Sequence, residues 1–145
     1  MVKYKEMMIL IIEDDDGHAE LIQEGLSEVG ICNQIIRFRN GLDAWNFLSG
    51  ESKGDEPVID KSKSYLLLLD INMPIMDGVE LLRRMKSNKE LKDIPVIMLT
   101  TTDDPREVEE CYKIGCSFYV TKPVDFMKFA ETLKRLGLFI QIIKL

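Results

Sequence analysis

Residues 65–70 read Tyr-Leu-Leu-Leu-Leu-Asp, an apolar run that ends on an acid. Three other short apolar runs also end on polar side chains: residues 7–12 before Glu13 and Asp14, 96–99 before Thr100, and 118–120 before Thr121 and Lys122. Runs that are apolar at nearly every position are typical of parallel strands buried on both faces. Ligands of an open α/β sheet bind beyond the carboxyl ends of its strands. We therefore expect one sheet edge to gather the acids, the hydroxyl and the ammonium, a set suited to a phosphoryl group and a divalent cation.

Helical patterns fill the segments between these runs. An aspartate at or beside Asp16 can cap a helix that runs to Val29, with Gly30 as its stop. Pro105 suits the first turn of a later helix. We expect the remaining elements at 34–38 (strand), 42–48, 78–88, 105–115 and 124 onward (helices), with a surface loop at 49–64. Five β/α units with crossover-length connections favour a doubly wound five-stranded parallel sheet of the α/β class.

Size and composition indicate an ordinary globular domain. A chain of 145 residues is most simply one domain, 1–145, and we expect no output domain beside it. The net charge of −6 argues against nucleic-acid binding, which needs a basic face. No apolar stretch approaches the ~20 residues of a membrane span, and the N-terminus lacks a cleavage signature, so we expect a cytoplasmic protein without a membrane contact. The three cysteines have no CxxC spacing and are expected to be reduced thiols.

Three carboxylates are candidates for a metal site. If Glu13, Asp14 and Asp70 converge, two charges ~4 Å apart cost about 4 kcal/mol at an effective dielectric of 20. A fold keeps such a cluster when a cation neutralises it or when its pKa values rise. Mg²⁺ fits, because it takes hard oxygen ligands and keeps waters for a phosphoryl group. In the alternative interpretation, residues 13–16 are a solvated helix cap whose charges favour the helix dipole.

Asp70 is also the natural nucleophile of this edge. Carboxylates form covalent aspartyl-phosphate intermediates, and a metal beside them neutralises phosphoryl oxygens. Lys122 supplies a cation and Thr100 a hydroxyl donor, although each residue alone is a weak signal. The alternative is that Asp70 serves only as a turn residue before Pro74.

Four motifs together carry a resemblance to a known family. They are Glu13-Asp14, the segment Leu-Leu-Asp-Ile-Asn-Met-Pro-Ile-Met-Asp-Gly (68–78), Leu-Thr-Thr (99–101) and Tyr-Val-Thr-Lys-Pro (119–123). In this order they closely resemble the receiver domain of two-component response regulators, over essentially the whole chain. Segments 13–26 and 99–101 are most similar to stand-alone regulators paired with phytochrome-type histidine kinases. The resemblance implies a flavodoxin-like strand order 2-1-3-4-5 with helices on both faces.

The resemblance also implies roles for matching positions. Asp70 would accept a phosphoryl group from the phosphohistidine of a sensor histidine kinase. Glu13, Asp14 and Asp70 would hold Mg²⁺ together with the backbone carbonyl of Asn72. Lys122 would pair with the phosphoryl group. Such a protein is a phosphoacceptor that assists its own phosphorylation and dephosphorylation, and it is not a turnover enzyme.

Two residues are implied as the conformational switch. Thr100 would move to hydrogen-bond the phosphoryl group, and Tyr119 would change rotamer, so that phosphorylation biases a bistable element. The chain departs from many receivers by carrying Glu13 where an aspartate is common, and the longer side chain is expected to reach the metal through water. Asn72 and Thr102 occupy positions that influence phosphate lifetime in this family.

Other conspicuous side chains have simpler interpretations. His18, the only histidine, is expected to be a partly exposed helix residue, because Mg²⁺ prefers oxygen ligands. Asp15 is expected to cap a helix rather than to coordinate the metal. Trp45 and Phe47 are expected to pack in the second helix. No Gly-rich phosphate loop occurs, so nucleotide binding has no support.

The C-terminal segment predicts a protein contact. Phe126, Ala130, Leu133 and Leu136 would form an apolar stripe that faces the sheet, and residues 138–145 are apolar on nearly all sides. Apolar surface beyond one stripe suggests a partner. We expect a homodimer through the fourth helix, the fifth strand and the C-terminal helix. The alternative is a tail that folds back onto its own domain.

Two further functions compete with the stand-alone receiver. A pseudo-receiver scaffold would bind partners without being phosphorylated, but Asp70, Thr100 and Lys122 form a complete set. A metal-dependent phosphohydrolase with Asp70 as nucleophile would need an Asp-x-Asp pair, and here the second position is Asn72.

Overall fold

The computed structural model describes residues 7–142 and contains a five-stranded parallel sheet. The strand order is β2-β1-β3-β4-β5, so the predicted fold class and topology are confirmed. The strands are β1 (Met7–Ile12), β2 (Ile35–Phe38), β3 (Ser64–Leu69), β4 (Val96–Thr100) and β5 (Phe118–Thr121).

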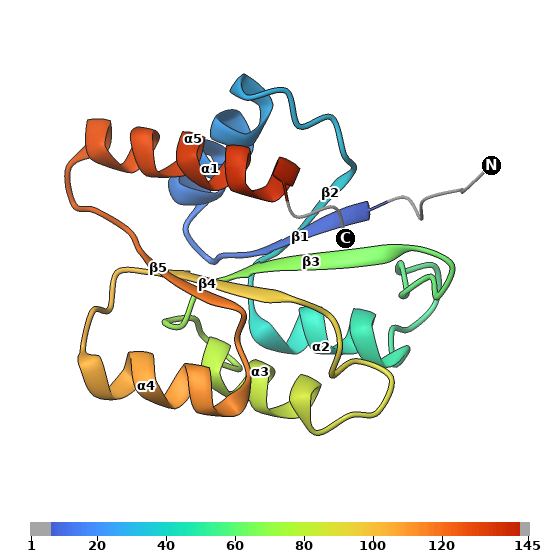
Figure 1. Ribbon diagram of the computed structural model, residues 1–145. Helices are drawn as coiled ribbons and strands as arrows, with labels where there is room; N and C mark the ends of the chain where they lie inside the picture. Colours follow the sequence, from blue (N-terminus) through green and yellow to red (C-terminus); the bar gives the residue numbers. More distant parts are fainter. Residues whose placement is uncertain (1–6, 143–145) are drawn as a thin grey trace.

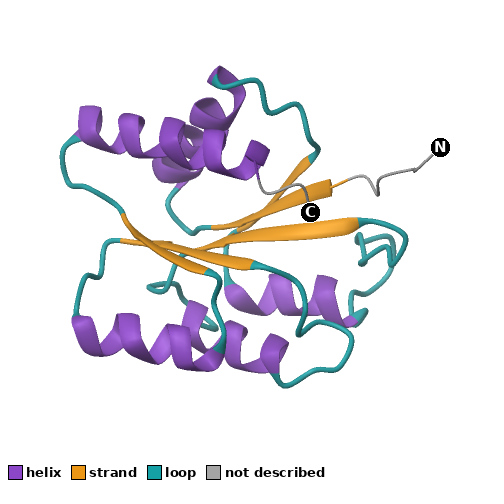
Figure 2. Ribbon diagram, in the orientation of Figure 1, coloured by secondary structure: helices purple, strands orange, loops and turns teal. Residues whose placement is uncertain are grey.

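Helices cover both faces of the sheet. They are α1 (Asp16–Glu28), α2 (Gly41–Ser49), α3 (Gly78–Lys86), α4 (Pro105–Ile114) and α5 (Phe126–Ile142). Helices α1 and α5 lie on one face, and α2, α3 and α4 lie on the other (Figures 1 and 2). All strands run in one direction, so their carboxyl ends share one edge, which lies at the left in Figure 1.

The helix starts follow from capping side chains. Asp15 precedes α1, and its carboxylate accepts the backbone N–H of His18 at 2.9 Å. Asn40 and Asp77 cap α2 and α3 in the same way. Each cap satisfies a backbone donor that the first helical turn leaves free. Asp15 is thus the capping residue, as the sequence predicts.

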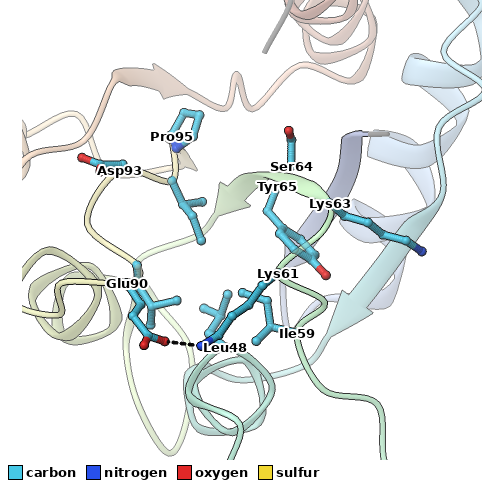
Figure 3. Close-up of a pocket in the computed structure, with 11 residues that line it drawn as sticks. Leu48, Ile59, Lys61, Lys63, Ser64, Tyr65, Glu90, Asp93 and Pro95 are labelled. Carbon is cyan, nitrogen blue, oxygen red and sulfur yellow. Dashed lines mark ion pairs between the residues drawn. The ribbon is translucent and has the colours of Figure 1, made fainter. Parts of the chain in front are cut away.

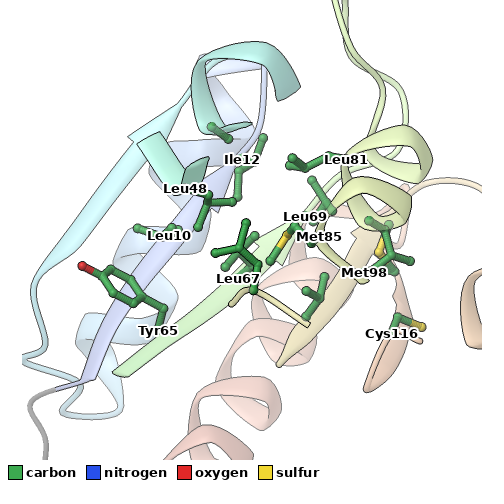
Figure 4. Packing of buried hydrophobic residues seen from close by; sticks show 14 of the residues in the cluster. Leu10, Ile12, Leu48, Tyr65, Leu67, Leu69, Leu81, Met85, Met98 and Cys116 are labelled. Carbon is green, nitrogen blue, oxygen red and sulfur yellow. The ribbon is translucent and has the colours of Figure 1, made fainter. Parts of the chain in front are cut away.

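Two apolar cores lie on the two faces of the sheet. Neighbouring residues of β1 alternate between them: Ile9 and Ile11 face α1 and α5, whereas Leu10 and Ile12 face α2 and α3. Figure 4 shows the second of these cores, in which side chains of β1, β3 and β4 meet α2 and α3. Because both faces are covered, no polar residue alternates with the apolar ones, which explains the continuous apolar runs of the sequence.

Helices α1 and α5 pack closely because glycines stand at their contacts. A Cβ placed on Gly25 of α1 would lie 2.7 Å from the Cβ of Leu133 in α5. A Cβ on Gly137 of α5 would lie 2.4 Å from Cγ2 of Val29. Both distances are shorter than side chains tolerate, so these positions keep the two helices in close contact.

The predicted stripe of the last helix needs correction. Phe126 is 64% exposed and does not face the sheet. Phe129 is buried in its place, together with Leu133, Leu136 and Ile140. The helix begins at Phe126 rather than at residue 124, so Phe126 lies at its first position, while the predicted Leu133 and Leu136 are buried as expected.

The end of α5 is partly covered by its own domain. Ile140 is buried, and the ring of Phe139 meets Phe118 of β5 edge-on, with 4.7 Å between centroids. Leu138 and Ile142 remain exposed. The last part of the predicted apolar tail, residues 143–145, lies outside the described residues.

Two further sequence predictions concern chemistry and membranes. Cys32, Cys111 and Cys116 are free thiols, and the last two are buried, as expected for reduced cysteines. Within residues 7–142, no helix combines the length and the apolar character that crossing a bilayer requires.

Candidate functional site

The carboxyl edge of the sheet brings the predicted site residues together. Glu13 follows β1, Asp70 follows β3, Thr100 ends β4, and Lys122 lies just beyond β5. All four are buried, which for the three charged side chains is unusual and demands partners. The parallel topology explains why residues far apart in sequence meet at this edge.

Three carboxylates form an acidic cluster here. Ligand oxygens of Glu13, Asp14 and Asp70 lie within 4.8 Å of one another. Glu13 and Asp70 are buried, whereas Asp14 is exposed. Oε2 of Glu13 is buried and has no hydrogen-bond partner among residues 7–142. A buried, unpartnered carboxylate oxygen beside two more carboxylates fits a hard divalent cation.

The ionisation of Glu13 supports the same interpretation. Burial raises the pKa of Glu13 to about 8, and the neighbouring Asp70 adds to this rise. The contact with Lys122 lowers the pKa but does not offset the burial. At neutral pH, therefore, the metal-free cluster tends to hold a proton where a cation would compensate the charge.

The ammonium of Lys122 lies between the acids. Its Nζ contacts Oε1 of Glu13 and lies 3.5 Å from Oδ2 of Asp70. The backbone N–H of Lys122 donates to the carbonyl of Thr100 at 2.7 Å, which ties this residue to the end of β4. The positive charge of Lys122 can therefore stabilise negative oxygens of Asp70 or of a group bound to it.

Hydrogen bonds and close packing hold Asp70 in place. Its N–H donates to the carbonyl of Ile12 at 3.1 Å, and its Oδ1 accepts the N–H of Ile71 at 2.8 Å. A Cβ on Gly78 would lie 2.0 Å from the carbonyl oxygen of Asp70, so only glycine lets the first turn of α3 approach. The second carboxylate oxygen, Oδ2, lies 3.5 Å from Nζ of Lys122.

Thr100 and Tyr119 lie on the α4 side of the acids. Oγ1 of Thr100 is buried and has no hydrogen-bond partner in the described part of the chain. The hydroxyl of Tyr119 donates to the backbone carbonyl of Thr102 at 2.6 Å, and burial raises the pKa of this phenol. The side chain of Asn72 donates to Oγ1 of Thr102 at 3.2 Å. An unpaired hydroxyl and a tethered tyrosine thus meet around the loop after β4.

His18 belongs to the site, although the sequence interpretation set it aside. Its side chain is 39% exposed, as expected, but Nδ1 lies 3.2 Å from Oε1 of Glu13 and 3.2 Å from Nζ of Lys122. The ring also lies against Phe129, at 5.7 Å between centroids.

Arg37 is a second residue that sequence reasoning missed. Its Nε and Nη2 donate to the backbone carbonyl of Glu13 at 3.1 and 2.8 Å, and its Nη1 pairs with Asp16 at 2.6 Å. The guanidinium therefore holds the backbone that carries the acids. A charged residue within a predicted buried strand is the signal that could have found it.

A separate pocket lies at the opposite edge of the sheet. It has a volume of about 590 Å³ and sits where β3 begins, beneath the loop that follows α2 (Figure 3). Lys61 and Glu90 pair across it at 3.0 Å, and both are well exposed. None of the acidic-cluster residues lines this pocket, so the chemistry of the carboxyl edge does not use it.

The sequence matches one protein family. The family described as the response regulator receiver domain matches residues 9–134. The chain is also 36% identical over 115 residues to the response regulator Rcp1 of Synechocystis sp., a match that covers 79% of this chain and 76% of Rcp1.

Solved structures show the same likeness. The receiver domain of a response regulator from Rhodospirillum rubrum superposes with a TM-score of 0.86 at 39% identity, covering 95% of this chain and 96% of that one. The Mn²⁺-bound form of Rcp1 gives 0.82 at 32% identity, with 92% and 93% covered. The phosphorylated cyanobacterial phytochrome response regulator RcpA gives 0.79 at 28% identity, with 94% of each chain covered.

Proposed function

Because the chain belongs to the response regulator receiver family, and is thus a phosphoacceptor of two-component signalling, we propose that Asp70 is its phosphorylated residue. The observation that carries this proposal is the surroundings of the Asp70 carboxylate. A rigidly held carboxylate faces a buried ammonium, and two further acids stand beside it. A turn residue before Pro74 would need neither neighbour.

We propose that Glu13, Asp14 and Asp70 hold Mg²⁺, with the backbone carbonyl of Asn72 as a further ligand. The unpartnered Oε2 of Glu13 and the raised pKa of this residue support a cation at this place. The related Rcp1 has been solved in a Mn²⁺-bound form. When bound, the ion offsets the charge of the carboxylates and of phosphoryl oxygens.

The phosphoryl transfer itself is a single displacement. A carboxylate oxygen of Asp70 attacks phosphorus, the new P–O bond forms, and the P–N bond of the donor phosphohistidine breaks with the electron pair going to the imidazole nitrogen. Lys122 supplies positive charge near the oxygens that become more negative. One phosphoryl group is transferred to the protein, which is acceptance rather than turnover.

We propose that Thr100 and Tyr119 respond to phosphorylation of Asp70 and so change the surface of the protein near α4 and β5. The unpaired Oγ1 of Thr100 is a donor available to the phosphoryl group. If the Thr100 side and the following loop shift toward Asp70, the carbonyl of Thr102 and its bond from Tyr119 shift as well. Phosphorylation would then change the population of two arrangements of one element.

The proposed phosphodonor is a sensor histidine kinase of the phytochrome type, because similarity extends to RcpA and Rcp1. Exposed apolar side chains follow two of the strands beside the acids: Ile75 lies on the loop after β3, Val124 on the loop after β5, and Phe126 and Met127 in the first turn of α5. Apolar residues without cover near a reactive centre suit a docked protein. Val124→Ala with Met127→Ala should slow transfer from a phosphorylated phytochrome-type kinase while phosphorylation by acetyl phosphate stays unchanged. Equal slowing with both donors would contradict this contact.

We further propose that the protein acts as a stand-alone regulator and pairs with a second copy through α4, β5 and α5. A groove of about 310 Å³ lies between β5 and α5, lined largely by apolar surface that includes Phe118 and Phe139. Leu138 adds exposed apolar area beside it. Light scattering should show a dimer that Leu138→Glu shifts toward the monomer. A monomer at tens of micromolar, with and without phosphorylation, would rule the dimer out.

One experiment tests the central proposal. The protein is incubated with Mg²⁺ and acetyl phosphate, and its intact mass is followed over time. We expect a transient increase by one phosphoryl group that Asp70→Asn abolishes. No adduct on the natural sequence, or an equal adduct on the variant, would overturn the proposal; the first outcome favours a scaffold. Calorimetry with Mg²⁺ alone tests the ligands, because Glu13→Gln should weaken binding about tenfold.

A further inference from the structure

We propose that His18 is a positioning residue that holds the ammonium of Lys122 above Asp70 through its Nδ1 lone pair. This inference rests on the proposed phosphorylation of Asp70. Nζ of Lys122 lies among three acceptors. An ammonium has three N–H donors. The structure gives it three acceptors, namely Oε1 of Glu13, Oδ2 of Asp70 at 3.5 Å and Nδ1 of His18 at 3.2 Å.

Burial makes this third acceptor matter. The side chain of Lys122 is only 2% exposed, so water does little to satisfy its donors. A buried charge is stable only when it is paired and fully hydrogen-bonded. Without His18, the ammonium would keep two acceptors, and both are carboxylates that the proposed reaction occupies.

The tautomer of His18 follows from its two neighbours. Nδ1 lies 3.2 Å from Oε1 of Glu13 and 3.2 Å from Nζ of Lys122, and one nitrogen carries either a proton or a lone pair. A proton on Nδ1 would face the ammonium donor-to-donor. Oε1 of Glu13 already accepts from Lys122. We therefore place the lone pair on Nδ1 and the proton on Nε2.

Two elements hold the ring in this position. Asp15 accepts the backbone N–H of His18 and so sets the start of α1. Phe129 of α5 packs against the imidazole with rings inclined at 38°. The ring is thus fixed from α1 and α5, the layer that is tightly packed, whereas Lys122 follows β5.

The contact with His18 matters most when the cation and the phosphoryl group occupy the carboxylates of Glu13 and Asp70. Oxygens of Glu13 and Asp70 are the proposed partners of the cation and the phosphoryl group, and a hard cation prefers these oxygens to an imidazole nitrogen. His18 is then the acceptor that stays with Lys122. It keeps the ammonium from turning away before the phosphoryl oxygens arrive.

Three variants separate this role from simple packing. His18→Leu keeps apolar bulk against Phe129 but removes the acceptor. His18→Asn places an amide oxygen near the position of Nδ1, and His18→Gln carries the same group one methylene farther out. With acetyl phosphate and saturating Mg²⁺, we expect His18→Leu and His18→Gln to be phosphorylated about tenfold more slowly than the natural sequence, and His18→Asn to recover to within about threefold. Thermal unfolding of each variant reports on folding separately.

A double-mutant cycle with Lys122→Ala and a tautomer measurement complete the test. Once the ammonium is gone, His18→Leu should change the rate by less than twofold. The ¹⁵N shifts of His18 in the metal-free protein should show a proton on Nε2. An unchanged rate in His18→Leu, or an equal slowing in the Lys122→Ala background, would overturn the role of His18. If the natural sequence takes no phosphoryl group at all, the proposed function of Asp70 fails, and a proton on Nδ1 then decides against the His18 contact.

Discussion

The α1–α5 layer and the α4–β5 layer differ in how much of each is buried. Helix α5 buries five residues and meets α1 at glycines that allow close approach. Helix α4 buries only Cys111, and no residue of β5 is fully buried. Glu13 of the acidic cluster contacts His18 of α1 and Lys122, which follows β5. A phosphoryl group at Asp70 therefore stands next to one part that resists movement and another that holds fewer native contacts.

The loosely packed side also carries the groups that would respond. Lys122 follows β5, and its N–H is bonded to Thr100 at the end of β4. Tyr119 lies on β5 and bonds to the loop before α4. Local stability is low where few apolar contacts exist. A small change in interaction free energy at Asp70 is therefore enough to shift α4 and β5.

The largest expected effect is the loss of packing between α1 and α5. Leu133→Ala removes a side chain that is 1% exposed and should lower the free energy of unfolding by about 3 kcal/mol. Leu138→Ala makes the same change on the same helix at a position that is 51% exposed, and should cost less than about 1 kcal/mol. Urea unfolding of both proteins measures the difference. Similar losses would remove the contrast between the two layers.

The next effect concerns the junction of the layers, where Glu13 meets Lys122. The pKa of Glu13 is raised from 4.5 to about 8, so between these pH values the folded state binds more protons than the unfolded one. Stability of the metal-free protein should therefore fall as pH rises from about 4.5 to about 8, because the folded state loses its additional proton over this range. Unfolding in the presence of a chelator measures this slope, and Glu13→Gln should flatten it. A stability that rises over this range would contradict the burial effect.

Thr100 offers a smaller effect with the opposite sign. Its hydroxyl is buried and has no hydrogen-bond partner within residues 7–142, so Thr100→Val should raise the free energy of unfolding by about 1 kcal/mol. The same change should leave the adduct on Asp70 but weaken the response of Tyr119, which tyrosine ring shifts in NMR spectra report. Thr101→Val, at the exposed neighbouring position, is the control. Destabilisation by Thr100→Val would show that the hydroxyl is satisfied in solution.

The sequence predicts most of this fold because its signals are local. Apolar runs ending on Asp70 and Lys122 mark strands whatever the details of packing, and parallel topology then brings their ends together. Phe126 shares a helical face with the buried Leu133, but it is the first residue of α5 and remains exposed. The spacing of apolar residues predicts which face of a helix is buried, but not which of its turns rests on the sheet.

His18 illustrates a limit of a different kind. Asp14, Asp15 and Asp16 are all competent N-caps, and each choice turns the following helix by about 100° relative to the next. In the structure the helix is capped by Asp15, and the His18 ring reaches Lys122. The cap at Asp15 is expected from the sequence, but the contact of the His18 ring also depends on where Lys122 lies after β5, which the local pattern does not give.

The smallest expected effect compares two tyrosine hydroxyls that accept backbone N–H groups. Tyr65 is buried and accepts from Asp60 at 2.8 Å, whereas Tyr112 is 47% exposed and accepts from Tyr119 at 3.0 Å. Tyr65→Phe should cost about 0.8 kcal/mol, because the buried hydroxyl no longer accepts the N–H of Asp60, and Tyr112→Phe less than about 0.5 kcal/mol, because water can replace the exposed hydroxyl.

Hydrogen exchange makes this comparison local. In Tyr112→Phe, the amide of Tyr119 should exchange about twofold to tenfold faster, while amides of β1 stay unchanged, because opening of β5 does not require opening of the central strands. An equal acceleration in β1 would mean that β5 opens only with the whole domain. The α4–β5 side would then be as rigid as the α1–α5 layer, and the path from Asp70 to the surface would have to run elsewhere.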